Sequence, residues 1–403
     1  MNPIKKLYCR IFQTCFRIAL PLLPYREPKI LGSTDMIPKI LKSKNIEKVL
    51  LVTDTMLRVN KVTLSLEENL KDKGIECFVY DKVQPNPTVS NVEAALKIYN
   101  DNSCQVIIAF GGGSPMDCAK AVGARVAYPN RTLDDMKGIL KIIKKIPLLI
   151  AVPTTAGTGS EVTLTSVITD SEKKHKYTMN SFPLIPRYAV LDPEVTYSLP
   201  KHLTATTGMD ALTHAVEAYI GRSTTKKTRR MAIEAIKLIY ENIETAYNHP
   251  LNKQARENML RASYLAGAAF TQSYVGYVHA VAHSLGGQYN ISHGLANSVL
   301  LPIVLKEYGD TIHSKLHKLA VSVGMSKESD DIALSAERFI AHIRGLNKRM
   351  NIGESFSQIR TEDIPVMAKH ADKEANPLYP VPKLMNAKEL EKFYYMVYEG
   401  TEI

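Results

Sequence analysis

Four histidines and one aspartate have the residue types and the spacing of a metal site. Asp210 and His214 lie four residues apart in the apolar stretch TTGMDALTHAVEAYI, so on a helix both point off one face. His279 and His283 repeat this spacing, and His293 follows beyond a glycine pair. Imidazoles with one carboxylate and no thiolate suit a borderline divalent ion such as Fe(II) or Zn(II), which can polarise a substrate oxygen.

The alternative interpretation is that each histidine is an ordinary hydrogen-bonded residue. A lone histidine among apolar residues usually is one, but two pairs at helical spacing fit this interpretation poorly. We apply it to the histidines outside the pattern, which are His175, His202, His249, His313, His317, His342 and His370.

A glycine-rich turn is the second feature with chemical potential. The apolar run QVIIAF leads into Gly111-Gly112-Gly113, and we expect Ser114 to cap the following helix and Pro115 to take its first position. Backbone N–H groups at such a helix start bind anions such as a pyrophosphate. The alternative is a sharp turn with no ligand, but its place at the end of a central strand favours a binding site.

Two further segments lie at the same expected sheet edge. Asp54 ends the run VLLVTD, where its carboxylate can bind an adenosine ribose and repel a 2′-phosphate, which favours NAD over NADP. Asp54 as a helix cap is an equally good interpretation. The loop VPTTAGTGSE at 152–161 offers hydroxyls and glycines for a second wall around phosphate or nicotinamide, or is an ordinary polar loop.

Two halves of the chain must position these residues. From about Lys29 to Pro193, short β-branched runs alternate with helical stretches, which predicts right-handed βαβ crossovers and a mainly parallel sheet. After Leu199 helical patterns dominate, so we expect an all-helical second half. The predicted strands are 49–54, 76–81, 105–110, PLLIAVPTT and YAVLDPE, and the predicted helices include 207–220, 227–246 and 253–285. The expected domains are an amphipathic segment at 1–26, a dinucleotide-binding α/β domain at 27–196 and a helical metal-binding domain at 197–403.

The first segment reads as one basic amphipathic helix that ends near Pro21 and Pro24. The favoured interpretation is a helix that covers part of the protein's own core or a subunit contact. Peripheral contact of residues 4–20 with an anionic membrane is the less favoured alternative. The apolar positions are Ile4, Leu7, Tyr8, Ile11, Phe12, Cys15, Ile18, Ala19 and Leu22, and the basic ones are Lys5, Lys6, Arg10 and Arg17.

The composition of the 403 residues narrows the class of protein. The 45% apolar and 23% charged content predicts a folded chain, and no apolar run is long enough for a membrane-spanning helix. The net charge of +11 is spread without a basic tract, which argues against nucleic-acid binding. Five cysteines with no C-x-x-C spacing favour a reducing, cytoplasmic compartment, since they indicate neither a disulfide framework nor a thiolate zinc site. They are Cys9, Cys15, Cys77, Cys104 and Cys118.

Taken together, the motifs resemble those of the iron-containing (group III) alcohol dehydrogenase family. These are GGGSPMDCAKAVG, TTAGTGSE, GMDALTHAVEAYI, HAVAHSLGGQYNISHG and NPLYPVP, in the family's order and spacing from about residue 30 almost to the C-terminus. The resemblance implies a Rossmann-like α/β domain followed by an all-α domain, the dehydroquinate synthase-like architecture, with the active site in the cleft between them. The amphipathic first segment is the main departure from the family pattern.

The resemblance also implies residue roles. The metal, usually iron and in some members zinc, would be held by Asp210, His214, His279 and His293, and His283 would lie near the metal and nicotinamide without being a ligand. The near-neutral intrinsic pKa of histidine would allow His283 to act as a catalytic proton relay. The cofactor-binding residues would be Asp54, Asn86, Gly112, Gly113, Ser114, Asp117, Thr154, Thr155, Thr158 and Lys176.

The expected activity is hydride transfer between a primary or secondary alcohol, or its aldehyde or ketone, and NAD(H), with a metal as Lewis acid. The expected partner is a small alcohol or aldehyde, and the expected assembly is a homo-oligomer, such as a homodimer. One alternative is a metal- and NAD-dependent lyase of the dehydroquinate synthase-like class. Another is a scaffold that binds only nucleotide.

Overall fold

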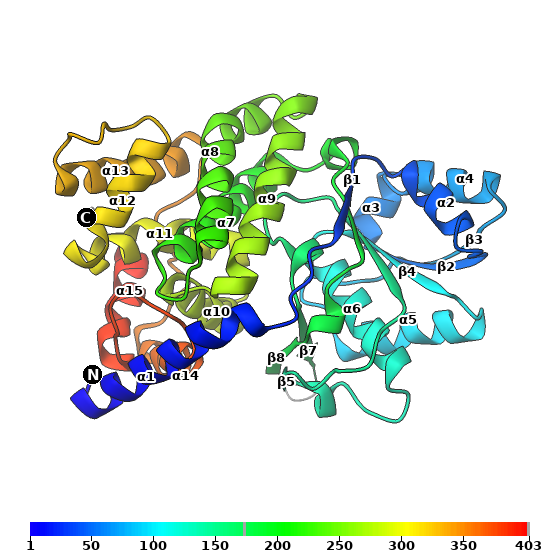
Figure 1. The fold of residues 1–403 in the computed structure, drawn as a ribbon, viewed down its shortest axis with the longest axis horizontal. Helices are drawn as coiled ribbons and strands as arrows, with labels where there is room; N and C mark the ends of the chain where they lie inside the picture. Colours follow the sequence, from blue (N-terminus) through cyan, green and yellow to red (C-terminus); the bar gives the residue numbers. More distant parts are fainter. Residues whose placement is uncertain (172–174, 401–403) are drawn as a thin grey trace. The chain divides into compact units, whose positions relative to one another are not determined.

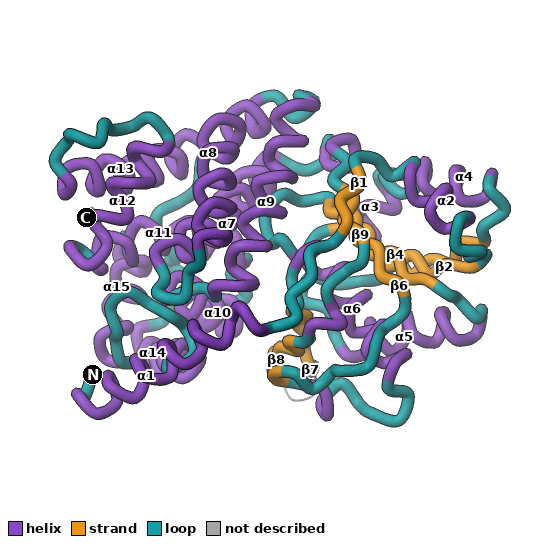
Figure 2. Tube along the Cα trace, viewed as in Figure 1, coloured by secondary structure: helices purple, strands orange, loops and turns teal. Residues whose placement is uncertain are grey.

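The computed structural model describes residues 1–171 and 175–400. The side chain of His175 is not among what it describes, so our interpretation of that histidine lies outside the described residues. The chain forms two compact units. The α/β unit comprises Pro24–Leu199 with Pro250–Tyr264, and the helical unit comprises Met1–Leu23, Pro200–His249 and the chain from Leu265 onward. All strands belong to the α/β unit (Figures 1 and 2).

A six-stranded sheet forms the centre of the α/β unit. Its order is β1-β9-β6-β4-β2-β3, and each neighbouring pair is parallel. The predicted parallel sheet is therefore confirmed, and β4 lies between β2 and β6 as a central strand. The strands are β1 (Lys29–Leu31), β2 (Lys48–Val52), β3 (Glu76–Tyr80), β4 (Val106–Gly111), β6 (Leu148–Pro153) and β9 (Tyr188–Val190).

Both faces of this sheet are covered by helices. Leu50 and Ile107 point into a core cluster with residues of α5 and α6, whereas Leu51 and Ile108 point into a second cluster with residues of α2 and α4. Burial on both faces explains why these strands are continuous apolar runs. The helices are α2 (Met36–Lys42), α3 (Thr55–Val59), α4 (Leu64–Asp72), α5 (Val89–Asp101) and α6 (Gly113–Ala127).

A smaller sheet was not predicted from the sequence. It has the order β5-β8-β7, with β7 and β8 antiparallel, and its strands are β5 (Gly138–Ile139), β7 (Thr165–Asp170) and β8 (His175–Asn180). β5 has only two residues, and β7 and β8 are rich in polar residues, so none of them forms the apolar run that marks the main sheet. The N–H of Thr169 on β7 donates to the carbonyl of Pro87, which holds the PNPT turn against this sheet.

The helical unit contains no strand among its described residues, which confirms the expected all-helical second half. Helix α9 begins in the α/β unit and ends in the helical unit. The helices are α7 (Lys201–Ile220), α8 (Lys226–Asn248), α9 (Lys253–Ser273), α10 (Tyr277–Tyr289), α11 (His293–Tyr308), α12 (Asp310–Ser322), α13 (Ile332–Arg349), α14 (Ile364–Ala375) and α15 (Ala387–Glu399), together with α1 (Pro3–Ala19) and the 3-10 turn η1 (Leu20–Leu22).

The single helical pattern predicted over 253–285 is wrong, because the structure has two helices there. Tyr274 has a positive φ of 63°, and Gly276 precedes α10. The carboxylate of Glu217 accepts hydrogen bonds from the N–H groups of Gly276 and Val278. A buried carboxylate on another helix therefore caps α10 at this point, and no local pattern could have revealed it.

The predicted helix at the start of the chain is confirmed as α1, which ends at Ala19 before η1. The helix covers part of the helical unit, where Cys9 and Gln13 are buried, but most of its apolar face does not take part, and the alternative of a subunit contact stays a prediction. Ile4 is 78% exposed and Ile18 69% exposed, whereas Gln13 is buried. Buried backbone carbonyls of the NPLYPVP segment need hydrogen-bond donors. The polar side of the helix therefore packs inward.

Candidate metal centre

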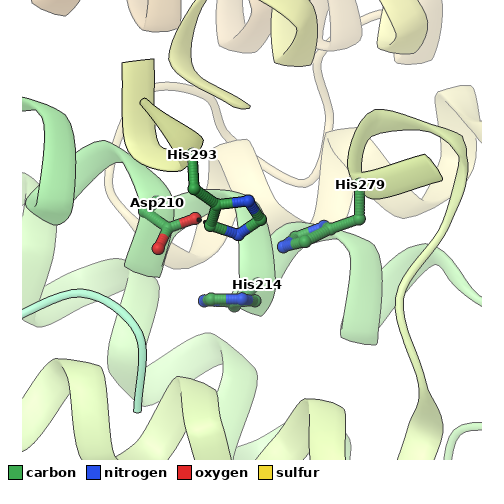
Figure 3. Close-up of side chains that lie close together, drawn as sticks. All are labelled: Asp210, His214, His279 and His293. Atoms are coloured by element: carbon green, nitrogen blue, oxygen red, sulfur yellow. Dashed lines mark ion pairs between the residues drawn. The ribbon is translucent and has the colours of Figure 1, made fainter. Parts of the chain in front are cut away.

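Asp210, His214, His279 and His293 converge in the helical unit. One ligand atom from each residue lies within 4.8 Å of the others (Figure 3). Oδ1 of Asp210 is 3.5 Å from Nε2 of His293. Asp210 and His214 come from α7, His279 from α10 and His293 from the first position of α11, so three helices build the cluster.

A glycine allows α11 to approach α7 closely enough to complete this cluster. A Cβ atom on Gly294 would lie 2.6 Å from the carbonyl oxygen of Thr206. Any side chain at this position would push the first turn of α11, and with it His293, away from α7. The glycine after His293 is therefore a requirement of the site.

Two imidazoles of the cluster, those of His279 and His293, are held in the neutral form. Burial, reinforced by His214, His293 and His283, lowers the pKa of His279 well below its usual value. Burial likewise lowers the pKa of His293 to about 4, against the opposing effect of Asp210. Neutral imidazoles keep a lone pair free for a cation, and three imidazoles with one carboxylate match the donors that Fe(II) or Zn(II) accepts. The cluster therefore fits a divalent metal.

Glu217 orients one of these imidazoles, and our reading of the sequence missed it. Its Oε2 lies 2.6 Å from Nδ1 of His279, which leaves Nε2 to face the cluster. Burial raises the pKa of Glu217 to about 7, although the N–H groups of Gly276 and Val278 oppose this. Carboxylates bonded to metal-binding histidines fix the tautomer in this way. The signal was available, because Glu217 follows Asp210 by two helical turns on one face of α7.

Asn297 is a second residue that sequence reasoning missed. Its Nδ2 lies 2.7 Å from Oδ1 of Asp210, 3.1 Å from Nε2 of His293 and 3.3 Å from Nε2 of His279. Its position four residues after His293 places it on the same face of α11. The amide therefore links three of the four candidate ligands.

His283 lies beside the cluster but not among its four members. Its ring centroid is 5.1 Å from that of His293, and its Nδ1 is 2.6 Å from Oε1 of Glu374. The hydroxyl of Tyr379 donates to the same carboxylate oxygen at 2.6 Å. Burial alone would lower the pKa of His283, but Glu374 outweighs it and holds the pKa above its usual value. His283, Glu374 and Tyr379 thus form a connected polar chain.

The glycine-rich turn forms in the α/β unit as predicted, with one correction. Helix α6 begins at Gly113 after the cap residue Gly112, so Ser114 is not the cap and Pro115 is not its first residue. Gly113 lets the helix begin earlier, and the Ser114 hydroxyl instead accepts a hydrogen bond from the N–H of Asn86. This bond joins the PNPT turn to the glycine-rich turn.

The 152–161 loop packs directly against these glycines. A Cβ on Gly112 would lie 3.3 Å from Cγ2 of Thr155, and one on Gly113 would lie 3.1 Å from Cγ2 of Thr158. The N–H of Thr154 donates to the carbonyl of Gly111 at 3.1 Å. The threonine side chains of the loop thus pack against the backbone of the two glycines, and a side chain at either glycine would crowd them.

The other predicted cofactor residues have structural partners. Oδ1 of Asp54 accepts a hydrogen bond from the N–H of Leu57 and caps α3, so the capping interpretation holds for that oxygen. Asp117 accepts from the hydroxyl of Ser160, and burial raises its pKa to about 6. Lys176 is half-buried on β8, opposite Thr169 of β7.

A parallel α/β unit with a glycine-rich turn, followed by a helical unit with a three-histidine, one-aspartate cluster, defines a two-part enzyme of the metal- and dinucleotide-dependent class. Two family models match the chain: iron-containing alcohol dehydrogenase over residues 30–193, and the C-terminal part of the Fe-containing alcohol dehydrogenase family over residues 204–398. The chain belongs to the iron-containing alcohol dehydrogenase family. It is an oxidoreductase, which confirms the dehydrogenase interpretation over the lyase and the scaffold.

Individual relatives agree with this assignment. The chain is 39% identical over 353 residues to the 1,3-propanediol dehydrogenase of Klebsiella pneumoniae, covering 86% of this chain and 90% of that protein. It is 34% identical over 342 residues to the NAD-dependent methanol dehydrogenase of Bacillus methanolicus, covering 84% and 90%. A crystal structure of a 1,3-propanediol oxidoreductase matches with a TM-score of 0.89 and 36% identity, over 93% of this chain and 99% of that one.

Proposed function

We propose that the enzyme transfers a hydride between a small primary or secondary alcohol, or the matching aldehyde or ketone, and NAD(H). The observation that carries this proposal is the convergence of Asp210, His214, His279 and His293 within one cluster of ligand atoms. The names of relatives that act on 1,3-propanediol and methanol support a short alcohol as the substrate.

The four clustered residues hold a divalent metal, Fe(II) or alternatively Zn(II). Such an ion supplies Lewis acidity that lowers the pKa of a substrate hydroxyl. Glu217 keeps Nδ1 of His279 protonated and Nε2 available, and Asn297 fixes the separation of α7 and α11 through Asp210 and His293. The protein thereby prepares the donor set before any ligand arrives.

His283 moves the substrate proton. Its raised pKa keeps it able to carry a proton near neutral pH, and Glu374 and Tyr379 give the proton a path away from the ring. This assigns His283 a catalytic role without making it a metal ligand.

The α/β unit binds NAD, which accepts or donates the hydride. The glycine-rich turn and the threonine loop hold the pyrophosphate, and the carboxylate of Asp54 disfavours the 2′-phosphate of NADP. The choice rests on Asp54, because an NAD-dependent methanol dehydrogenase and an NADPH-dependent butanol dehydrogenase are both 34% identical to the chain. The residues assigned to the cofactor are Asp54, Asn86, Gly112, Gly113, Ser114, Asp117, Thr154, Thr155, Thr158 and Lys176.

The proposed functional domains are residues 27–196 for the dinucleotide and residues 197–403 for the metal, with an amphipathic segment at 1–26 of which Met1–Leu23 belongs to the helical unit. The enzyme works in a reducing cytoplasmic compartment as a homo-oligomer, such as a homodimer. The free thiols of all five cysteines support a reducing compartment.

Absorbance at 340 nm tests the proposal. Protein purified without oxygen is mixed with Fe(II), NADH and a panel of short aldehydes, with NADPH in a parallel set. We expect NADH oxidation with at least one aldehyde. His279→Ala should lose both the activity and the bound metal. His202→Ala, at an exposed histidine on the same helix as Asp210, should keep normal activity and normal metal content. No oxidation across the panel by metal-loaded protein would refute it.

A further inference from the structure

Helix α1 presents its apolar face to solvent. Ile4, Ile11 and Ile18 repeat at helical spacing and are 78%, 54% and 69% exposed. Leu7, Tyr8 and, in η1, Leu22 extend the same stripe, and all of them are exposed. Large apolar side chains gathered on one outward face of a helix mark a docking surface.

The opposite side of α1 is tied to the helical unit, so this orientation is built in. The side-chain amide of Gln13 donates to the carbonyl of Tyr379 at 2.7 Å, and Arg10 donates to the carbonyls of Val381 and Pro382 at 2.8 Å each. Lys5 forms an ion pair with Asp372 of α14 at 2.9 Å, and Figure 1 shows α1 beside α14. These bonds hold the apolar stripe outward.

Cations border this stripe. Residues 1–26 contain no Asp or Glu, and Lys6 and Arg17 are exposed, whereas Lys5 and Arg10 are engaged with the helical unit. Lys6 lines a groove beside the helix together with Arg10, Lys383 and Glu389, and Lys383 is paired with Glu307 at 2.7 Å.

The positive charge continues beyond α1 within the helical unit. Burial, together with the neighbouring cations Arg222, Arg229 and Arg17, lowers the pKa of Lys315 to about 8. A second groove is lined by Lys226, Arg229 and Arg230. A stripe of exposed apolar side chains next to a cluster of Lys and Arg side chains is the arrangement that binds an anionic lipid surface.

We propose that residues 3–22 dock the enzyme on the surface of an anionic bilayer, with the α1 stripe in the acyl boundary and the bordering cations among the headgroups. The helix is about 26 Å long and lies in the plane of the interface. Among the described residues, no helix is long and apolar enough to cross a membrane, which agrees with a surface contact. The docking surface is independent of the proposed catalytic function.

A second copy of the chain is a poorer occupant of this face. Two such helices placed face to face would bring the cations bordering one stripe against those of the other, without an acidic residue in either segment. Like charges held close together repel, whereas phospholipid headgroups supply the missing negative charge.

The fluorescence of a single introduced tryptophan reports what covers the stripe, because the chain contains no tryptophan of its own. Ile11→Trp places the probe on the stripe, and Ile143→Trp places a matched probe at an 81% exposed position of the α/β unit. With vesicles of phosphatidylcholine and phosphatidylglycerol, we expect a blue shift and reduced acrylamide quenching for Ile11→Trp alone. With vesicles of phosphatidylcholine alone the blue shift should shrink, because the anionic headgroups are missing. It should also shrink in about 0.5 M salt, which screens the charge attraction.

Vesicle co-sedimentation of the full chain completes the test. Ile11→Asp with Ile18→Asp should lower the partition coefficient by about tenfold or more, and Arg17→Gln by about fivefold. Ile143→Asp and Lys44→Gln are the controls, since both positions are exposed and distant in sequence from α1, and should leave it unchanged.

Two results would overturn the proposal. One is failure of the wild-type chain to bind the anionic vesicles. The other is a blue shift of Ile11→Trp that needs no vesicles and grows with protein concentration, together with an assembly of the double aspartate variant that is smaller than the wild-type assembly in ultracentrifugation. Both observations would mean that a second copy of the chain covers the stripe.

Discussion

The Nδ1 of His279 donates a hydrogen bond to Oε2 of Glu217 at 2.6 Å, and both groups are buried. The same carboxylate receives the first N–H groups of α10, so one side chain of α7 both begins α10 and aims its histidine. The position of His279 is therefore set by a residue 62 positions away in the chain.

Glu217→Gln should weaken metal binding about 10- to 100-fold. The glutamine amide nitrogen cannot accept the bonds that one carboxylate oxygen accepts now, so the His279 ring loses its fixed tautomer. Metal content by elemental analysis and competition with a chelator measure the loss. Glu244→Gln on α8, at a partly exposed glutamate paired with Arg349, is the matched control. Unchanged metal affinity in Glu217→Gln would leave this residue only its capping role.

His283→Ala should lower turnover about a hundredfold or more while bound metal stays near the wild-type level. Glu374→Gln should act in the same direction but less strongly, because it removes the charge that raises the pKa of His283 and leaves the ring in place. Steady-state rates and metal analysis of both variants provide the comparison. Loss of metal from His283→Ala would instead make this histidine a ligand.

Gly113→Ala should raise the KM for NADH about tenfold and leave the metal content unchanged. The new Cβ would lie 3.1 Å from Cγ2 of Thr158, and overpacking of this kind costs about 1–3 kcal/mol. Gly32→Ala is the control, because its Cβ meets no atom within 4 Å. A normal KM in Gly113→Ala would argue that the cofactor phosphates lie elsewhere.

Glu161 should make the α/β unit less stable as the pH rises. Burial raises its pKa to about 7, and its Oε1 has no hydrogen-bond partner among the described residues. The folded state therefore keeps a proton that the unfolded state releases near the ordinary value of 4.5, and stability falls between about pH 4.5 and 7. Glu161→Gln should remove this loss, which amounts to about 3 kcal/mol at most.

Denaturant unfolding at pH 5 and pH 8 measures this difference. Glu161→Gln should gain over the wild type mainly at pH 8, whereas Glu76→Gln, at a 62% exposed side chain, should change little at either pH. An equal gain at both pH values would exclude proton release as the cause.

The sequence by itself predicted five of the six strands of the main sheet, but not β1, and it pointed to five candidate metal-binding residues, from which the family resemblance selected the four that cluster. Strands β2, β4 and β6 are buried on both faces, so each is a continuous apolar run that local pattern detects. Asp210 and His214 share a helix face at a spacing of four, which depends on helical geometry alone.

Only the tertiary structure decided the partners of those residues. The bonds of Glu217 to His279 and of Glu374 to His283 join separate helices, and the break before α10 exists because Glu217 caps it. The outward stripe of α1 depends on carbonyls of the 377–382 segment that bind Arg10 and Gln13. Periodicity within a segment shows which residues share a face, but the groups that this face meets come from distant parts of the chain, and packing alone brings them together.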